Sequence, residues 1–228
     1  MRRIIVGTFL SLDGVMQAPG GPEEDRTGQF EYGGWTVPYW DDVIAGAMGE
    51  SFSKPFDLLL GRRTYDIFAA HWPHQVTDPN DPGFVPGEGE IARMFNEVTK
   101  YVATHRPESL NWQNSELLGD DIIASLRAIK ATEGPDLSVS GSSELVHQLL
   151  ASDLVDELRL LIYPVVLGRG KRLFDGQSMP SAFKLVSSTT SPSGVIIANY
   201  QRSDELKTGS FAMDHPSEEE IERRKNLS

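Results

Sequence analysis

The stretch FDLLLGRRTY, residues 56–65, is the most informative part of this sequence. Its apolar first half predicts a strand over residues 56–60, after which a glycine breaks the pattern and two arginines and a threonine lead into a helix. Free backbone N–H groups at a helix N-terminus attract anions, and arginine forms paired hydrogen bonds with phosphate. The pattern therefore predicts a phosphate-binding turn, with a plain strand-to-helix turn carrying solvated arginines as the alternative. The candidate ligands are Gly61, Arg62, Arg63 and Thr64.

A second corner of the same kind lies in VSGSSELVHQLL, residues 139–150. A short strand predicted over residues 137–140 breaks at Gly141, and Ser142 and Ser143 open an amphipathic helix. Backbone N–H groups and serine hydroxyls at this helix start are candidates for holding another phosphate, and an ordinary capped helix start is the alternative. Two phosphate-binding corners in one domain suit a dinucleotide.

A third predicted strand end also carries residues of the types that bind phosphate. Residues 100–104 predict a strand that ends at Thr104, and Arg106 follows two residues later. In an open α/β sheet the strand ends line up along one crevice, so these side chains belong beside the two corners. Arg106 would add positive charge near an adenosine phosphate, which favours NADP over NAD. A solvated loop arginine is the alternative.

The composition of the 228-residue chain is that of a globular protein, with 39% hydrophobic and 24% charged residues. We expect one folded domain over residues 1–203. Residues 204–228 lose apolar periodicity and contain SEEEIERRKN, which predicts a polar, charged tail. The formal net charge of -12 opposes nucleic-acid binding, because the phosphate backbone repels an acidic protein.

The absence of cysteine excludes disulfides, thiolate metal sites and cysteine nucleophiles. No run reaches the roughly 18 apolar residues of a membrane helix, and the N-terminus enters a strand pattern without a secretory signal. We therefore expect a cytoplasmic protein that binds no membrane. Of the five histidines only His71 and His74 lie close together, and this incomplete ligand set predicts no metal site.

The order of the predicted elements indicates the fold class. Strands alternate with helices, and two hairpin-like strands near residues 182–190 and 195–202 follow a long strand over residues 155–163. This order predicts an α/β fold with helices around one mixed sheet. A helix with a proline in its first turn is expected over residues 38–52, and a glycine- and proline-rich surface loop over residues 17–36.

Common nucleotide-binding and hydrolase motifs are absent from the sequence. It contains no GxGxxG after a strand, no Walker loop, no HExxH and no GxSxG. A dinucleotide would therefore be held by a different arrangement.

Four motifs together resemble the dihydrofolate reductase-like superfamily: SLDG at residues 11–14, LLLGRRTYDIF at 58–68, VSGSSELVHQLL at 139–150 and VDELRLLIYPVVLGRGKRLF at 155–174. Within that superfamily the chain is similar to the C-terminal reductase domain of the bacterial riboflavin-biosynthesis bifunctional deaminase/reductase. The resemblance extends over residues 3–202, and the order and spacing of the motifs make it specific for the fold.

The resemblance implies a three-layer fold in which helices flank a central, mainly parallel sheet with a C-terminal β-hairpin. It also implies NADPH as the cofactor, bound across the carboxyl edge of the sheet. Gly61, Arg62 and Thr64 match the family's phosphate-binding turn, with Arg62 on the adenosine 2′-phosphate. Thr104 and Arg106 match positions for further adenosine-side contacts.

The resemblance places Gly141, Ser142 and Ser143 at the family's glycine-rich pyrophosphate turn. The chain departs from the family pattern at Ser140, where relatives commonly carry the first of two glycines, although a serine hydroxyl can donate to phosphate. Members of the family commonly dimerise through sheet-edge strands, so a homodimer is expected, with residues 155–166 as a contributor.

Residues that contact the substrate are predicted at three positions in the sequence. Dihydrofolate reductases carry a pterin-binding carboxylate near a W-x-x-P helix start, and here Trp40 stands at that position with Asp41 next to it. Asp13 in SLDG is the acid nearest the expected nicotinamide pocket and is predicted to orient or relay a proton, with an ordinary Asp-Gly turn as the alternative. Arg169 and Lys171 are candidates for a substrate phosphate or for plain loop charge.

Three functions remain open from the sequence. The first is an NADPH-dependent oxidoreductase of the riboflavin-biosynthesis type, a 5-amino-6-(5-phosphoribosylamino)uracil reductase that transfers hydride to a small heterocyclic or phosphoribosyl substrate. The chain lacks the zinc signature of the deaminase half, so its native substrate is expected to have diverged. The alternatives are a dihydrofolate or pterin reductase and a non-catalytic nucleotide-binding protein that retains the fold.

Overall fold

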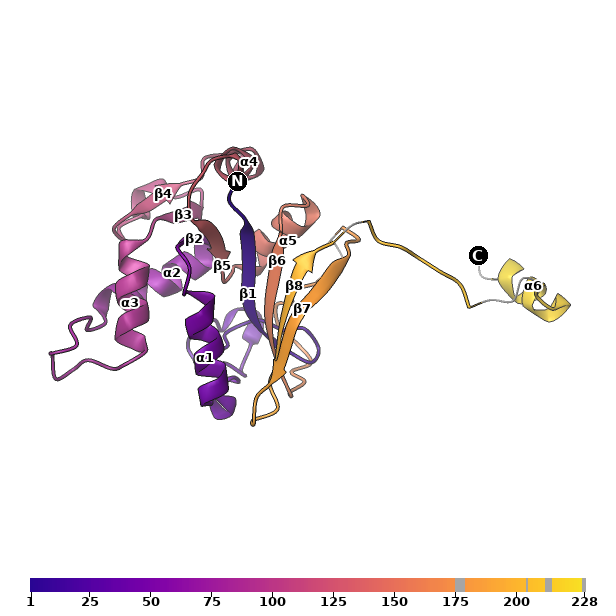
Figure 1. Cartoon of the computed structure of the whole chain (residues 1–228), viewed down its shortest axis with the longest axis horizontal. Coiled ribbons are helices and arrows are strands. Elements are labelled where there is room, and N and C mark those ends of the chain that lie inside the picture. The colour runs from indigo at the N-terminus through magenta and orange to yellow at the C-terminus, as the bar shows by residue number, and fades with distance from the viewer. Residues whose placement is uncertain (175–178, 204, 212–214, 227–228) are drawn as a thin grey trace.

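The computed structural model describes residues 1–174, 179–203, 205–211 and 215–226. Eight strands form one sheet, and their bounds are β1 Ile4–Ser11, β2 Phe56–Gly61, β3 Lys100–Ala103, β4 Ser115–Leu117, β5 Asp136–Val139, β6 Glu157–Tyr163, β7 Phe183–Thr190 and β8 Ile196–Arg202. Their order is β4-β3-β2-β5-β1-β6-β8-β7 (Figure 1). The strands from β4 to β6 in this order are parallel, whereas β8 and β7 are antiparallel. The predicted α/β class, the mixed sheet and the C-terminal hairpin are confirmed.

Helices cover both faces of the sheet, which gives three layers. In the described residues they are α1 Asp42–Ser51, α2 Arg62–His71, α3 Glu88–Glu97, α4 Ile122–Ala131, α5 Ser143–Ala151 and α6 Glu218–Lys225. None of them is long and apolar enough to cross a membrane.

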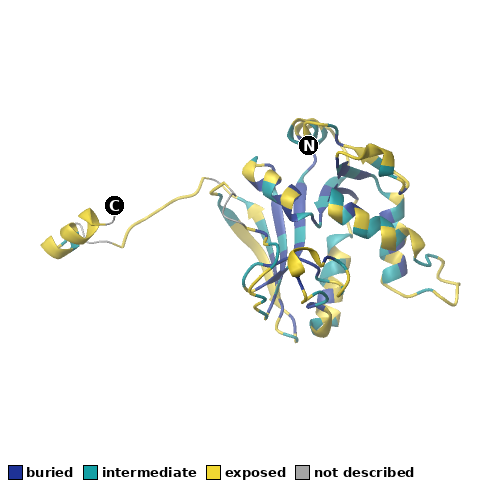
Figure 2. Ribbon diagram, turned by 180° about the vertical axis from the view of Figure 1, so that it is seen from behind, coloured by how far each residue is buried: buried dark blue, intermediate teal, exposed yellow. Residues whose placement is uncertain are grey.

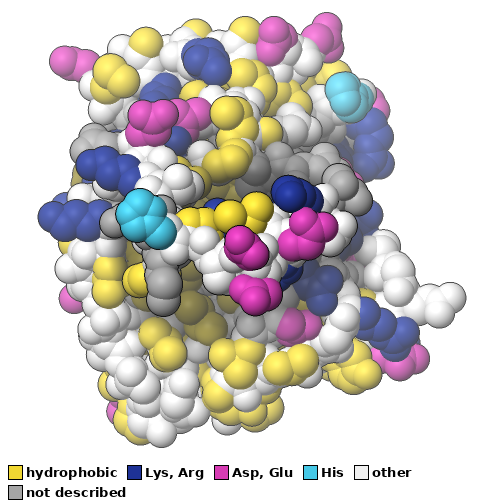
Figure 3. All heavy atoms as spheres, turned by 90° about the vertical axis from the view of Figure 1, so that its right-hand side faces the viewer, with side chains coloured by type: hydrophobic (Ala, Val, Ile, Leu, Met, Phe, Trp, Pro, Cys, Tyr) yellow, Lys and Arg dark blue, Asp and Glu magenta, His cyan; other side chains and the backbone are white. Residues whose placement is uncertain are grey.

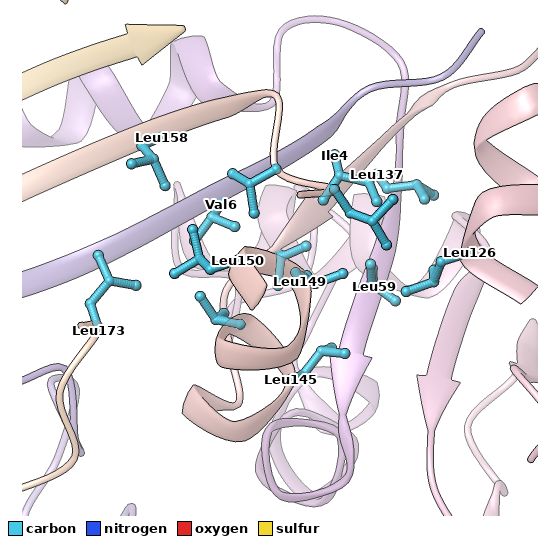
Figure 4. Packing of buried hydrophobic residues seen from close by; sticks show 14 of the residues in the cluster. Ile4, Val6, Leu59, Leu126, Leu137, Leu145, Leu149, Leu150, Leu158 and Leu173 are labelled. Carbon is cyan, nitrogen blue, oxygen red and sulfur yellow. The ribbon is translucent and has the colours of Figure 1, made fainter. Parts of the chain in front are cut away.

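Strand β2 shows how the sequence produces the layers. All of its residues are buried, as expected for an inner parallel strand covered on both faces. Successive side chains point to opposite faces. Leu59 joins the core beneath α4 and α5, where Leu126 and Leu149 lie (Figure 4). Leu58 and Leu60 face the opposite way, into the cluster formed with α2 and α3.

The helix predicted over residues 38–52 begins later than expected. Val37–Tyr39 forms a separate 3₁₀ turn that holds the proline, and α1 starts at Asp42. Asp41 is the N-cap of α1, because its carboxylate accepts hydrogen bonds from the backbone N–H groups of Val43 and Ile44. The 3₁₀ turn ends in extended backbone at Trp40, so the helix cannot run through this segment.

The segment after β8 leaves the body of the molecule, and α6 lies apart from the sheet (Figure 1). Figure 2 shows buried central strands and a tail that is mostly exposed. Ion pairs from Glu220 to Arg223 and Arg224 lie within α6 itself. Residue 204, where the predicted tail begins, lies outside the described residues, so the domain boundary remains a prediction.

Candidate functional site

The two predicted corners touch each other. The Gly61 N–H donates to the Gly141 carbonyl at 3.1 Å. A Cβ on Gly61 would overlap the Ser142 side chain and lie 2.8 Å from the Ser142 backbone nitrogen, and a Cβ on Gly141 would lie 2.6 Å from Thr64 Oγ1. Gly141 also has φ 152°, and its peptide bond to Ser142 is cis. Only glycine at both positions allows the starts of α2 and α5 to approach this closely.

The start of α2 carries positive charge, which is unusual at a helix N-terminus. Its first two residues are Arg62 and Arg63, its first turn contains no acidic residue, and its N-cap, Gly61, provides no side-chain hydrogen bond. Cations are unfavourable at the positive end of a helix dipole, where carboxylates or phosphates are stabilising. A local arrangement that opposes helix stability in this way is typical of a functional site, here one for an anion.

Arg62 extends toward the end of β3. Its Nη1 donates to Ser109 Oγ at 2.6 Å and approaches Thr104 Oγ1 at 3.5 Å and the Arg106 carbonyl at 3.4 Å. Its other edge pairs with Asp66 at 2.5 and 3.0 Å. The first and third predicted strand ends are therefore joined through one guanidinium group.

The start of α5 differs from that of α2. Ser142 is its N-cap but forms no side-chain capping hydrogen bond, and Ser143 is buried. Glu144 occupies the first turn, as helix stability favours. This corner offers backbone N–H groups and hydroxyls without a cation of its own.

A hollow of about 610 Å³ lies between the three strand ends. Thr64 and Gly141 do not line it and instead form the contact between the two corners. The other predicted cofactor residues line it: Gly61, Arg62, Arg63, Thr104, Arg106, Ser142 and Ser143.

A second hollow of similar volume lies on the other side of Asp66, between α2 and the loop around Trp112. Amide and aromatic residues line it, and the described lining contains no lysine or arginine. The excess of cations therefore distinguishes the hollow at the strand ends as the candidate phosphate site.

Arg63 turns away from Arg62 and contacts the loop predicted to cross the surface. Its Nη1 lies 3.1 Å from Asp25 Oδ1, and Lys171 Nζ lies 2.6 Å from Asp25 Oδ2. The Asp25 side chain is only 7% exposed. Burial opposes its ionisation, but the hydrogen bonds from Lys171 and Thr27 outweigh burial and lower the pKa of Asp25. Asp25 thus ties this loop to α2, a role that its polar loop sequence did not reveal.

Asp13 connects the first strand to the loop after β6. Ser11 Oγ donates to its carboxylate at 2.7 Å, as do the backbone N–H groups of Leu167 at 3.0 Å and Gly168 at 2.9 Å. Partial burial would raise its pKa, but these hydrogen bonds lower the pKa from 3.8 to about 2. Asp13 is therefore ionised at neutral pH and positions the loop.

The remaining predicted substrate residues are not gathered around the hollow, apart from Lys171. Trp40 is 52% exposed, and the second Asp41 oxygen accepts from the Ser193 N–H at 3.2 Å. Arg169 pairs with Glu31 at 3.1 Å in the surface loop. Their role in binding substrate stays a prediction.

Tyr163 is a residue that sequence reasoning missed. It ends β6, is completely buried, and is surrounded by the rings of Phe9, Trp35 and Tyr39 with centroids 5.3–6.0 Å away. Within the described part of the chain its hydroxyl has no hydrogen-bond partner. Burial and the nearby Asp41 carboxylate raise the pKa of Tyr163. In the sequence, the feature that points to Tyr163 is its position at the end of a predicted strand.

The sheet, the paired corners and the hollow define a three-layer α/β protein with a candidate anion site at the carboxyl edge of its sheet. Residues 2–197 match the model of the RibD C-terminal domain, and the chain belongs to this family. "Uncharacterized protein YyaP" from Bacillus subtilis (strain 168) is 28% identical over 197 residues, which cover 86% of this chain and 92% of YyaP.

Two solved structures are similar in fold. One is a diaminohydroxyphosphoribosylaminopyrimidine deaminase/5-amino-6-(5-phosphoribosylamino)uracil reductase from Thermotoga maritima, with a TM-score of 0.54 and 18% identity over 89% of this chain and 57% of that chain. The other is dihydrofolate reductase from Enterococcus faecalis, complexed with NADP(H), with a TM-score of 0.51 and 14% identity over 89% of this chain and 97% of that chain. The dihydrofolate reductase-like fold implied by the four motifs is thereby confirmed.

Proposed function

We propose that the protein is an NADPH-dependent reductase of the riboflavin-biosynthesis type, acting on a small heterocyclic or phosphoribosyl substrate. The observation that carries this proposal is the meeting of three strand ends around one hollow that Arg62 and Arg106 supply with positive charge. Membership of the RibD C-terminal domain family supports it.

The residues present fit the cofactor. The touching glycine corners leave the starts of α2 and α5 side by side, so backbone N–H groups and the hydroxyls of Ser142 and Ser143 would hold the pyrophosphate. Arg62, with Arg106 beside it, would hold the 2′-phosphate. Bound NADPH would supply the hydride.

Asp13 serves in this proposal as a positioning residue. Its carboxylate holds the backbone of Leu167 and Gly168, and the same loop continues to Lys171 at the hollow. A carboxyl group with a pKa of about 2 is a poor proton donor at neutral pH. The proton for the reduction would therefore come from another donor or from water.

The proposal extends to a homodimer formed through the edge of the sheet. β6, in the segment predicted to contribute, lies inside the sheet, whereas β7 is an edge strand. Leu185 and Val186 of β7 are 47% and 54% exposed. Figure 3 views the molecule from the side on which the C-terminal segment extends, and hydrophobic side chains lie there among polar and charged ones. An unpaired edge with apolar side chains favours strand pairing with another copy. Light scattering of the purified protein should give twice the 25.2 kDa chain mass.

A paired titration tests the cofactor assignment. NADPH and NADH are titrated into the parent and into Arg62→Ala by calorimetry. Loss of a charged hydrogen-bonding group should weaken NADPH binding by about 1.5 to 3 kcal/mol and NADH binding little. Arg26→Ala is the matched control, because Arg26 is exposed, pairs with Glu23 and does not line the hollow. Equal losses for both cofactors would contradict the assignment of Arg62.

Turnover distinguishes the alternative functions. Oxidation of NADPH is followed with 5-amino-6-(5-phosphoribosylamino)uracil and with dihydrofolate. Reduction of dihydrofolate alone would favour the pterin reductase. Cofactor binding without turnover on either compound would favour a non-catalytic nucleotide-binding protein.

A further inference from the structure

Asp66 lies between the two arginines assigned to the 2′-phosphate. It is one helical turn after Arg62 on α2, and its side chain is 45% exposed. Its Oδ1 accepts from Arg62 Nη2 at 2.5 Å, and its Oδ2 accepts from Arg62 Nε at 3.0 Å. Arg106 Nη2 lies 3.5 Å from the same Oδ2. One carboxylate at the lining of the hollow therefore contacts both guanidinium groups.

Helix stability alone gives little reason for this pair. An acid–base pair four residues apart stabilises a helix more when the acid is on the N-terminal side, and here Arg62 precedes Asp66. The arginine also occupies the first position of α2, where a cation is unfavourable. The arrangement is better explained by what it does to the hollow.

The pair occupies the hydrogen-bonding edge of Arg62 that a phosphate would use. The Nε and Nη2 atoms of an arginine form its bidentate edge, and here both point to Asp66. The remaining nitrogen, Nη1, donates to Ser109. A 2′-phosphate must therefore compete with Asp66 for these donors, and it also meets the negative charge of Asp66 at short range.

Asp66 opposes a 2′-phosphate but favours a ribose 2′-hydroxyl. A hydroxyl donates a hydrogen bond that a carboxylate accepts, and in Rossmann folds, which are built differently from this chain, an acid on the ribose 2′-hydroxyl selects NAD. The hollow thus combines two features, arginines suited to the 2′-phosphate and a carboxylate suited to the 2′-hydroxyl.

Resting on the proposed function, we propose that Asp66 determines the cofactor specificity and that the hollow binds NADH as well as NADPH. Asp66 accepts the ribose 2′-hydroxyl of NADH and restrains the arginines that would otherwise favour NADPH. The native protein then uses either nicotinamide cofactor.

The test compares the affinities of NADPH and NADH in the parent and in Asp66→Asn. The parent should bind the two cofactors within about tenfold of each other, since the two recognition features oppose each other. The asparagine side chain of the variant is not charged and keeps only one acceptor oxygen, so it releases part of the arginine edge; NADPH binding should tighten about tenfold while NADH binding weakens severalfold. The ratio of the two affinities is the readout.

Glu144→Gln provides the matched control. Glu144 lines the same hollow at the start of α5, so its substitution removes one negative charge there without touching the arginine pair. It should change both affinities alike and leave their ratio unchanged. Thermal melts of all variants check that each is folded.

The outcomes separate the two proposals. If the parent binds neither cofactor, the proposed function fails and the assignment of Asp66 fails with it. If the parent binds NADPH more than about a hundredfold tighter than NADH, or if Asp66→Asn leaves the ratio unchanged, the specificity role of Asp66 is wrong while NADPH binding stands.

Discussion

The carboxyl edge of the sheet has two halves with opposite character. The open half, formed by the ends of β2, β3 and β5, surrounds a hollow with exposed cations. The closed half, formed by the ends of β1 and β6, contains Asp13, with its internal hydrogen bonds, and Tyr163, inside a ring of aromatic side chains. Parallel strands bring both halves to one edge, and the open half carries the excess of cations and two helix starts without side-chain caps.

The two halves differ in whether their polar groups are already paired within the protein. In the open half, glycines bring two helix starts together, and their donors are in place before a ligand arrives, so little ordering is needed on binding. In the closed half the carboxylate of Asp13 is already used by the protein. A ligand on that side must therefore fit around existing hydrogen bonds.

The largest effect should come from filling the contact between the two corners. In Gly61→Ala the new methyl group meets the Ser142 backbone nitrogen at 2.8 Å, and backbone cannot yield as a flexible side chain does. We expect a loss of about 1 to 3 kcal/mol in the free energy of unfolding and loss of NADPH binding. Urea denaturation and calorimetry measure the two effects.

Gly7→Ala is the control for this substitution. A Cβ on Gly7 in β1 has no atom within 4 Å, so stability and cofactor binding should stay near those of the parent. Equal behaviour of the two variants would show that close contact of the corners does not shape the open half.

A smaller effect is expected in the closed half from Asp13→Asn. Because the folded-state pKa of Asp13 is lowered from 3.8 to about 2, its carboxylate stabilises the protein above pH 4 and loses this contribution as the pH falls through 2. Asp13→Asn should lower the free energy of unfolding at pH 7 by about 1 kcal/mol, after allowance for solvent screening. Urea denaturation at several pH values measures it.

The pH dependence identifies the cause of that loss. The difference between parent and Asp13→Asn should shrink as the pH is lowered from 5 to 2, because the parent carboxyl group then takes up its proton. A difference that is the same at every pH would mean that the ionised carboxylate does not hold the loop.

The smallest effect should come from Tyr163→Phe. A buried hydroxyl without a partner costs stability, so its removal should leave the free energy of unfolding unchanged or raise it by up to about 1 kcal/mol. Chemical denaturation measures the change. A clear loss of stability would indicate that a buried water satisfies the hydroxyl, so that the closed half holds water as well as aromatic side chains.

Much of the open half could be predicted from sequence because its signals are local. An apolar run, a glycine and a helix start follow one another within about ten residues, and period and turn chemistry decide such features. The corners at Gly61 and Gly141 and the strand end at Thr104 were found in this way. The observed start of α1 differs from the prediction because Pro38 also suits a short 3₁₀ turn.

Local sequence patterns are sufficient to predict the class of fold and the three strand ends with the residue types that they carry. Which charges meet depends on the tertiary structure. Arg62 pairs with Asp66 and reaches Ser109, whereas its neighbour Arg63 pairs with Asp25 from a distant loop. The reason is physical: strand and helix patterns repeat at fixed short intervals, but the partner of a long charged side chain depends on packing between segments far apart in the chain.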